Sequence, residues 1–366
     1  MRLITKIYTV IKHVYDKNKE WHFLSTPNNE FAIDDFQTSF NINRNICSND
    51  SAKIFEKIKE RSSNSRLFYY NGECYFEPEW LWGITKEGQL IEFSVPNNCC
   101  QWSQYESHPR PSHFDIQHRW SKRQYDKIIV FDDFYNFSKN YYHFMVKMLA
   151  QFFHMKRKGI DLSLPVLCPA KLREKKFFKE FAELFPALKK LNYIDYHNTI
   201  IKCNGFYIST GNTMFPEQLD LFRTITIPFN IVKKKVFVGR KNVARIAANS
   251  TEIEKIVESK GFETIYFENY SIAEQIAIIR TAERIVAYHG AGLTNLLFVQ
   301  NQNLKVLEIH NANANLYYHY MLICNIKGLQ YDCFVGGDLI NDTYYVDPIE
   351  FERKFSQWLN GPSEEK

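Results

Sequence analysis

Residues 283–295 read ERIVAYHGAGLTN, an apolar run that passes into His-Gly-Ala-Gly and then into a second apolar stretch. This order predicts a buried strand, a glycine-rich turn and a helix. We expect Gly290 and Gly292 to adopt positive φ and to let the backbone approach a ligand closely. A helix start presents unpaired N–H groups and the positive end of its dipole, which suit phosphate. The alternative is a turn that serves packing alone.

The sequence around this turn alternates regularly from about residue 233 to residue 335. Two capping boxes are predicted, one formed by Thr251 and Glu254 and one by Ser271 and Glu274. The alternation predicts an α/β fold with a parallel, doubly wound sheet, in which ligands bind beyond the carboxyl ends of the strands. Strands are predicted at residues 235–239, 262–267, 284–288, 305–309 and 330–334, and helices at 251–260, 271–282, 293–299, 315–327 and 348–359.

The first half of the chain is less regular, but it contains one clear α/β unit. An apolar strand at 127–131 ends in Asp132 and Asp133. After a polar loop, apolar residues at 145, 148, 149 and 152 predict a helix with one buried face. A helix near 171–184 and strands near 192–210 would extend this layer.

Composition limits the classes of protein to consider. The 366 residues carry a net charge of +5 with dispersed Lys and Arg, and no nucleic-acid-binding signature is present. The 8 Cys form no C-x-x-C pair and have no zinc spacing, so we expect free thiols in a reducing cytoplasm. The chain contains no apolar run of membrane-spanning length. Residues 1–15 are basic and amphipathic, which allows peripheral membrane association, packing on the protein itself being the alternative.

These residues resemble glycosyltransferase family 61, and the resemblance covers about residues 125–335. Its strongest part is the run from Thr281 to Phe298, which contains HGAGLTN and is followed by Val306-Leu307-Glu308-Ile309. A second part is Val238-Gly239-Arg240-Lys241 with Arg245 and Asn249, and a third is Asn140-Tyr141-Tyr142-His143-Phe144. The chain departs from the family pattern at Lys147, where an acidic residue is usual, and at Ser250, where Glu is frequent.

The resemblance implies a GT-B-type architecture, in which two Rossmann-like domains face each other across a cleft. On this basis we expect an N-terminal acceptor-side domain at 1–228, a C-terminal nucleotide-sugar-binding domain at 229–345, and a closing helix and tail at 346–366. It also implies a nucleotide-sugar donor, most often a UDP-sugar, inversion at the anomeric carbon and no obligatory metal or other cofactor. The chain has no Asp-x-Asp motif, which agrees with that expectation.

The donor-side residues have distinct predicted roles. The turn would bind the departing diphosphate, and Arg240 and Arg245 would offer guanidinium donors to phosphate oxygens. Glu308 lies within an apolar strand, so it needs partners: ribose hydroxyls are one set, and an ion pair with a core Arg is the alternative. Gln275 would reach the sugar or the base, or pack within its helix. The predicted donor-binding residues are Arg240, Arg245, Gln275, His289, Gly290, Ala291, Gly292, Leu293, Thr294, Asn295 and Glu308.

The catalytic base is expected on the acceptor side, where its pKa must suit proton removal from a hydroxyl. The candidates are His143, Asp133 and Asp132. His143 could instead cap or pack its helix, and the two aspartates could cap a turn. Lys147 cannot replace the usual acid unless its pKa is strongly lowered.

Three functions are compatible with these features. The first is an inverting glycosyltransferase of the bacterial polysaccharide type, acting on a surface polysaccharide or lipid-linked glycan from the cytoplasm or the inner face of the membrane. The second is a non-catalytic nucleotide-sugar-binding or scaffold subunit of a glycan assembly complex, which Lys147 motivates. The third is a different transferase on a similar scaffold, which the order Arg240, His289, Glu308 disfavours.

Overall fold

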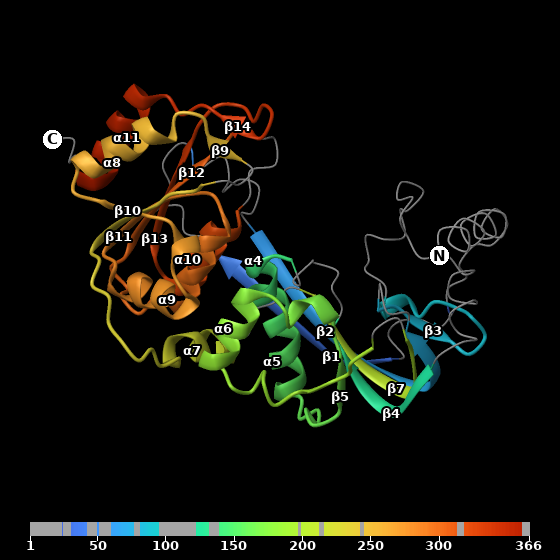
Figure 1. The fold of residues 1–366 in the computed structure, drawn as a ribbon. Helices are drawn as coiled ribbons and strands as arrows, with labels where there is room; N and C mark the ends of the chain where they lie inside the picture. The colour runs from blue at the N-terminus through green and yellow to red at the C-terminus, as the bar shows by residue number, and fades with distance from the viewer. Residues whose placement is uncertain are drawn as a thin grey trace, which may run out of the picture. The chain divides into compact units, whose positions relative to one another are not determined.

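The computed structural model divides the chain into two compact units (Figure 1). The first contains Met1–Thr38 and Ser63–Gln218, and the second contains Ser39–Ser62 and Leu219–Lys366. The structure describes residues 24, 31–41, 50, 60–76, 81–94, 122–131, 139–196, 199–211, 216–241, 245–312 and 318–360.

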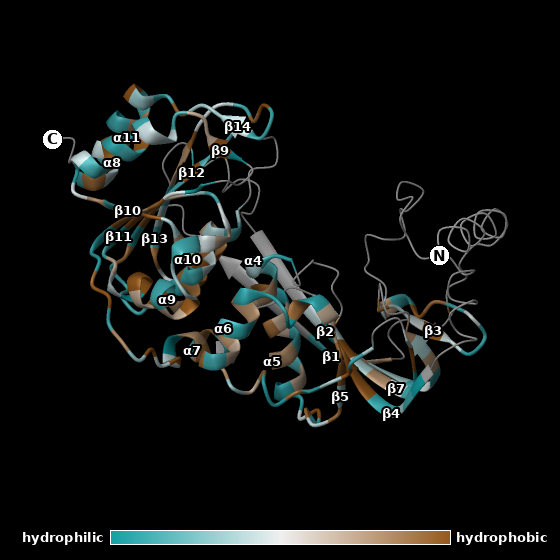
Figure 2. Cartoon of the chain, in the orientation of Figure 1, coloured by the Kyte–Doolittle hydropathy of each residue, from teal (hydrophilic) through white to brown (hydrophobic). Residues whose placement is uncertain are grey.

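The second unit contains a five-stranded, fully parallel sheet with the strand order β10-β8-β11-β12-β13. Numbered along the chain, this is the doubly wound order 2-1-3-4-5. The predicted α/β class and parallel sheet are therefore confirmed. The strands are mainly brown in Figure 2 because both of their faces are apolar. Their bounds are Lys235–Val238 (β8), Glu263–Ile265 (β10), Arg284–Tyr288 (β11), Lys305–His310 (β12) and Gln330–Val335 (β13).

Successive residues of β11 are all buried from Ile285 to Tyr288. Val286 and Tyr288 pack with Phe351 and Phe355 in one apolar cluster. Ile285 and Ala287 must face the other side, since side chains alternate along a strand. Helices on both faces therefore exclude water from the sheet, as a continuous apolar strand requires.

The helices of this unit begin and end for identifiable reasons. Ser271 and Glu274 form the predicted capping box at the start of α9. The box predicted at Thr251 and Glu254 is wrong: α8 has Asn249 at its N-cap, without a side-chain cap. The Asn249 amide instead bonds the backbone of Val346 in both directions, at 2.8 and 3.1 Å. Helix and short-strand bounds are Pro216–Thr224 (α7), Ile246–Ala247 (β9), Ser250–Ser259 (α8), Phe267–Asn269 (η7), Ile272–Thr281 (α9), Ala291–Phe298 (η8), His319–Lys327 (α10), Thr343–Tyr344 (β14) and Pro348–Asn360 (α11).

The first unit contains a mixed sheet with the order β1-β2-β7-β4-β5-β6, in which β3 also pairs with β2. Strands β4, β5, β6 and β7 are parallel, and β2 is antiparallel to β7. Strand bounds are Ala32–Asn41 (β1), Glu60–Phe76 (β2), Gly83–Thr85 (β3), Lys122–Val130 (β4), Pro165–Leu167 (β5), Asn192–Tyr193 (β6) and Ile200–Gly211 (β7), and helix bounds are Glu92–Ser94 (η3), Tyr141–His143 (α4), Phe144–Met148 (η5), Leu149–Arg157 (α5), Ala170–Leu172 (η6) and Lys176–Leu184 (α6).

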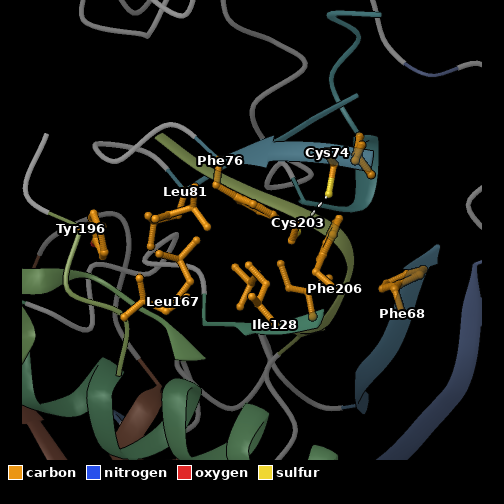
Figure 3. Close-up of a cluster of buried hydrophobic side chains, with 14 of the residues drawn as sticks. Phe68, Cys74, Phe76, Leu81, Ile128, Leu167, Tyr196, Cys203 and Phe206 are labelled. Carbon is orange, nitrogen blue, oxygen red and sulfur yellow. Dashed lines mark hydrogen bonds between the residues drawn. The ribbon is translucent and has the colours of Figure 1, made fainter. Parts of the chain in front are cut away.

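Aromatic side chains build the core of this sheet (Figure 3). Phe76 meets Phe206 edge to face, with ring centroids 4.9 Å apart. Cys74 and Cys203 are paired across β2 and β7, and their sulfur atoms lie 3.3 Å apart as free thiols. Burial of such rings contributes about 2–3 kcal/mol each, which stabilises a sheet whose strands come from distant segments.

A buried polar network fixes α5 on this sheet. His154 Nε2 lies 2.7 Å from Asp34 Oδ2, and His154 Nδ1 lies 2.9 Å from Ser209 Oγ and 3.2 Å from Ser65 Oγ. The order Ser-His-Asp matches that of a hydrolytic triad. Both hydroxyls are buried, however, so no substrate reaches them, and the network is structural.

Within the described residues, no helix is both long and apolar enough to cross a bilayer. The GT-B arrangement and the domains 1–228, 229–345 and 346–366 stay predictions. The amphipathic segment 1–15 and the tail 361–366 lie outside the described residues.

Candidate functional site

The candidate site lies where the winding of the parallel sheet reverses, between β8 and β11. In doubly wound sheets, ligands bind beyond the carboxyl ends of the strands at this point. Arg240 follows the end of β8, and His289 follows the end of β11. The topology therefore brings together two residues that the sequence predicts to bind the donor.

Arg240 and the glycine turn are in direct contact. Nη1 of Arg240 donates a hydrogen bond to the carbonyl oxygen of His289. A Cβ atom on Gly290 would lie 2.7 Å from the same Nη1, and one on Gly292 would lie 2.8 Å from Cδ2 of Phe267. A side chain at either position would therefore have to displace its neighbour, Arg240 at Gly290 or Phe267 at Gly292.

The expectation of positive φ for these glycines is wrong. Gly290 has a φ of 176°, which is extended backbone, and Gly292 is not among the glycines with positive φ. The close approach of Arg240 to Gly290 and of Phe267 to Gly292 explains why glycine occupies both positions. The residue of this region that does have positive φ is Arg245, at 60°, a conformation that non-glycine residues adopt in only a few per cent of cases.

The helix predicted after the turn is present as a 3-10 helix, η8. It begins at Ala291 without a side-chain cap, and the Leu293 N–H bonds the Gly290 carbonyl at 3.0 Å. Thr294 and Asn295 are fully buried, and Asn295 Nδ2 donates to Gln275 Oε1 at 2.8 Å. Within the described part of the chain, the Thr294 hydroxyl makes no hydrogen bond.

Gln275 is held inside the protein. Its Nε2 donates to the carbonyl oxygens of Phe267 at 2.8 Å and Tyr270 at 3.0 Å, while its Oε1 accepts from Asn295. These bonds join α9, η7 and η8. The geometry favours the packing role of Gln275 over contact with a sugar or base.

Glu308 is fully buried on β12, and both of its oxygens have protein partners. Oε1 accepts from Nδ1 of His289 at 2.6 Å, and Oε2 accepts from the Tyr331 hydroxyl at 2.6 Å. Nε2 of His310 lies 3.3 Å from Oε2. Glu308 is therefore placed to hold His289 rather than to face ribose hydroxyls directly.

The electrostatics of this region favour an anion. Burial lowers the pKa of Arg240, and the neighbouring charge of Arg245 lowers it further. Burial also lowers the pKa of His289, although Glu308 opposes this, and His310 and Arg245 add to the lowering. Burial tends to raise the pKa of Glu308, but His310 and His289 hold it well below its usual range. Positive groups gathered at strand ends in this way are typical of ligand sites.

His289, Glu308 and His310 also have the composition of a metal-ligand set, with their ligand atoms within 4.8 Å of one another. The 2.6 Å separation between His289 Nδ1 and Glu308 Oε1 is that of a hydrogen bond. Two atoms bound to one Zn²⁺ at about 2.1 Å would lie roughly 3.4 Å apart. Glu308 is thus the shared partner of both histidines, at 2.6 Å from His289 and 3.3 Å from His310.

In the first unit, Asn140 caps the helix that carries His143. Its Oδ1 accepts from the N–H groups of Tyr142 at 2.9 Å and His143 at 3.4 Å. Burial, with a smaller effect of Lys147, lowers the pKa of His143 to about 4. Lys147 is buried in η5, a π-helical turn of the kind that occurs frequently at functional sites. Asp132 and Asp133 lie outside the described residues.

Two residues of the site were not identified from the sequence, His310 and Tyr331. His310 lies two residues after Glu308 and so faces the same side of β12, a signal that the alternation of a strand could have provided. Tyr331 comes from the neighbouring strand β13, and only the register of the two strands brings it to Glu308.

Comparison with known proteins gives two matches. Residues 141–306 match the sequence profile of the family described as Glycosyltransferase 61. The chain is also 24% identical over 127 residues to the EGF domain-specific O-linked N-acetylglucosamine transferase of Drosophila melanogaster. That stretch covers 33% of this chain but only 24% of the fly protein. The two matches support family 61 and a glycosyltransferase.

Proposed function

We propose that the protein is an inverting glycosyltransferase that moves a sugar from a nucleotide-sugar to a hydroxyl of a glycan acceptor. The observation that carries this proposal is the convergence of Arg240, Arg245 and His289 at the switch point of a doubly wound sheet. The family match over residues 141–306 supports the same reaction class.

In this mechanism, the second unit binds the donor. Arg240 and Arg245 offer guanidinium N–H groups to the diphosphate, and the start of η8 adds its backbone N–H groups. These donors stabilise the negative charge that develops on the departing nucleoside diphosphate, which is the main task in breaking the bond to the anomeric carbon. The UDP class of donor and a GT-B arrangement of the two units are part of the proposal.

The acceptor hydroxyl must lose its proton as it attacks the anomeric carbon. His143 is the candidate base within the described residues, because its ring is neutral at pH 7; its pKa of about 4 in the free protein makes it a weak base, so a bound substrate must raise that pKa for efficient proton removal. Asp132 and Asp133 are the other candidates. Surface polysaccharide or lipid-linked glycan synthesis in the cytoplasm is the proposed setting, and the free buried thiols support a reducing compartment.

A thermal-shift screen tests the donor site. The purified protein is melted with UDP, GDP, CMP, dTDP and their common sugars, including UDP-N-acetylglucosamine because the fly relative's name specifies that sugar. A ligand that binds the folded state raises Tm by mass action. We expect a shift with one nucleotide class that is lost in Arg240→Ala and His289→Ala. Arg284→Ala, at the opposite end of β11, is the matched control and should retain the shift.

A non-catalytic nucleotide-sugar-binding or scaffold subunit is the second candidate, and the buried Lys147 favours it. Release of free nucleotide from the bound donor, with and without glycan acceptors, separates the two. The transferase should release nucleotide, and chelation of divalent ions should leave the rate unchanged if no metal is required. Binding without release under every condition would support the scaffold.

A further inference from the structure

The turn of the candidate site contains a histidine whose ring is bonded to a buried carboxylate. We propose that Glu308 positions His289 for the donor's diphosphate and that His289 takes up a proton when the diphosphate binds. This inference rests on the proposed function, because it assigns the donor to the turn. It adds a positioning residue and a proton-linked step to that site.

The hydrogen-bond pattern fixes which nitrogen of His289 titrates. Glu308 is ionised and its Oε1 can only accept, so Nδ1 of His289, 2.6 Å away, carries a hydrogen. The other carboxylate oxygen accepts from the Tyr331 hydroxyl at 2.6 Å. Nε2 is therefore the nitrogen that gains or loses a proton. The carboxylate cannot rotate without breaking two short bonds, so it also fixes the orientation of the ring.

The charged and titratable groups around His289 come from β12, β13, α10 and the segment between β8 and β9. Glu308 and His310 lie on β12, and the rings of His289 and His310 are 4.8 Å apart between centroids. Tyr331 lies on β13, and the Tyr320 ring on α10 is 5.3 Å from the His289 ring. Arg240, after β8, donates a hydrogen bond to the His289 carbonyl oxygen, and the charge of Arg245 lowers the pKa of the His289 ring.

Without a ligand, these surroundings favour the neutral ring. Burial is the largest effect that lowers the pKa of His289, and the charges of His310 and Arg245 act in the same direction. A diphosphate bound at the turn would reverse the balance, since its negative charges favour the imidazolium. The protonated Nε2 then donates a charge-assisted hydrogen bond to a phosphate oxygen. Affinity should therefore rise as pH falls from 8 to 6.

Isothermal titration calorimetry tests the proton uptake directly. The probe is UDP-N-acetylglucosamine, whose diphosphate has no group that titrates near neutral pH. Binding is measured at pH 7.5 in PIPES, HEPES and Tris, which differ in ionisation enthalpy. The slope of the binding enthalpy against buffer enthalpy gives the protons taken up, and we expect a value approaching about one. A slope of zero with clear binding would overturn the inference while leaving the donor site intact.

Variants assign the proton to its residue. His289→Asn should bind more weakly and take up no proton, whereas His310→Gln should keep the uptake. Glu308→Gln should weaken binding by about tenfold and change the uptake, because a neutral amide no longer fixes Nδ1–H. Tyr331→Phe is the milder second variant if Glu308→Gln does not fold, and it should shift the pH dependence of binding in the same direction.

Other results would refute the role of His289 or that of Glu308. Uptake that persists in His289→Asn, or that disappears in His310→Gln alone, would assign the proton elsewhere and refute the role of His289. If Glu308→Gln and Tyr331→Phe alter melting but leave uptake and its pH dependence unchanged, Glu308 is only structural. If the probe produces no heat of binding, the proposed UDP-sugar site fails and this inference fails with it.

Discussion

At the scale of single residues, Gly290 and Gly292 differ in what a methyl group would displace. A Cβ on Gly290 meets Nη1 of Arg240, the end of a flexible side chain. We predict that Gly290→Ala folds with little loss of stability but moves the guanidinium and weakens donor binding by about tenfold, or about 1.4 kcal/mol. Calorimetry with the nucleotide-sugar, together with urea unfolding of the free protein, measures the two effects.

Gly292→Ala is the matched comparison. Its Cβ would meet the ring of Phe267, which is buried and cannot move away as Arg240 can. Overpacking of this kind costs about 1–3 kcal/mol, so this variant should lose stability. Equal losses of stability in the two variants would contradict the assignment of Arg240 as the partner of Gly290.

The sequence identified the glycine turn, but it could not provide the reason for it. Positive φ is the usual explanation for glycine, whereas Gly290 is extended and makes room for Arg240. In the same way, Glu308 stood out as a carboxylate in an apolar strand. Its partner Tyr331 is brought to it by pairing between strands, which no local pattern specifies.

At the scale of elements, η8 is held at its C-terminal end by cations. Nζ of the buried Lys327 donates to the Leu297 carbonyl at 2.8 Å, and Arg280 Nε donates to the Phe298 carbonyl at 3.4 Å. Cations suit this end of a helix because its carbonyl groups carry partial negative charge. The two residues thus fix the helix whose other end forms the candidate diphosphate site.

Lys327 should make stability depend on pH. Burial, with smaller effects of Arg223 and Arg280, lowers its pKa to about 8, below the ordinary value of 10.5. Between these values the unfolded state binds more protons, so stability rises with pH. We predict that wild type gains up to about 3 kcal/mol relative to Lys327→Met between pH 8 and 10.5. Urea unfolding across this range measures the difference.

Lys354→Met is the control for that experiment. Asp50 and Glu350 raise the pKa of Lys354 above 10.5 despite its partial burial. Its contribution is fully present below pH 10.5 and is lost as pH rises through the folded-state value. The difference between wild type and Lys354→Met should therefore stay constant from pH 8 to 10. A constant difference for Lys327→Met as well would refute the assigned pKa.

Elements with strong local patterns were predicted well. Strands β8, β11, β12 and β13 and the capping box of α9 agree with the sequence within a residue or two. The failures have tertiary causes. The predicted capping box of α8 is absent, and the side chain of Asn249 at its N-cap bonds the Val346 backbone instead of the N–H groups of the helix. The π-helical turn at 144–148 interrupts a segment whose apolar spacing predicts a regular helix.

At the scale of the whole molecule, the second unit depends on a segment far away in the sequence. Asp50 belongs to this unit although it precedes most of the first. Its Oδ2 accepts from Lys354 Nζ at 2.7 Å and from the Val335 N–H at 3.3 Å. Contacts between residues some 300 positions apart leave no local pattern in the sequence. The predicted domains therefore run continuously along the chain and place Asp50 in the N-terminal domain.

We predict that Asp50→Asn in the full chain destabilises the second unit by about 1–3 kcal/mol, because the partly buried ammonium of Lys354 and the backbone N–H of Val335 lose their charged partner. Hydrogen exchange should become faster in α11 and β13, while β4 and β7 of the first unit keep their protection. Asp35→Asn is the control, since its pair with Arg66 is 3.0 Å long but exposed and should contribute less than about 1 kcal/mol. Equal acceleration in both units would mean that they unfold as one cooperative body, and Asp50 would then stabilise the whole chain.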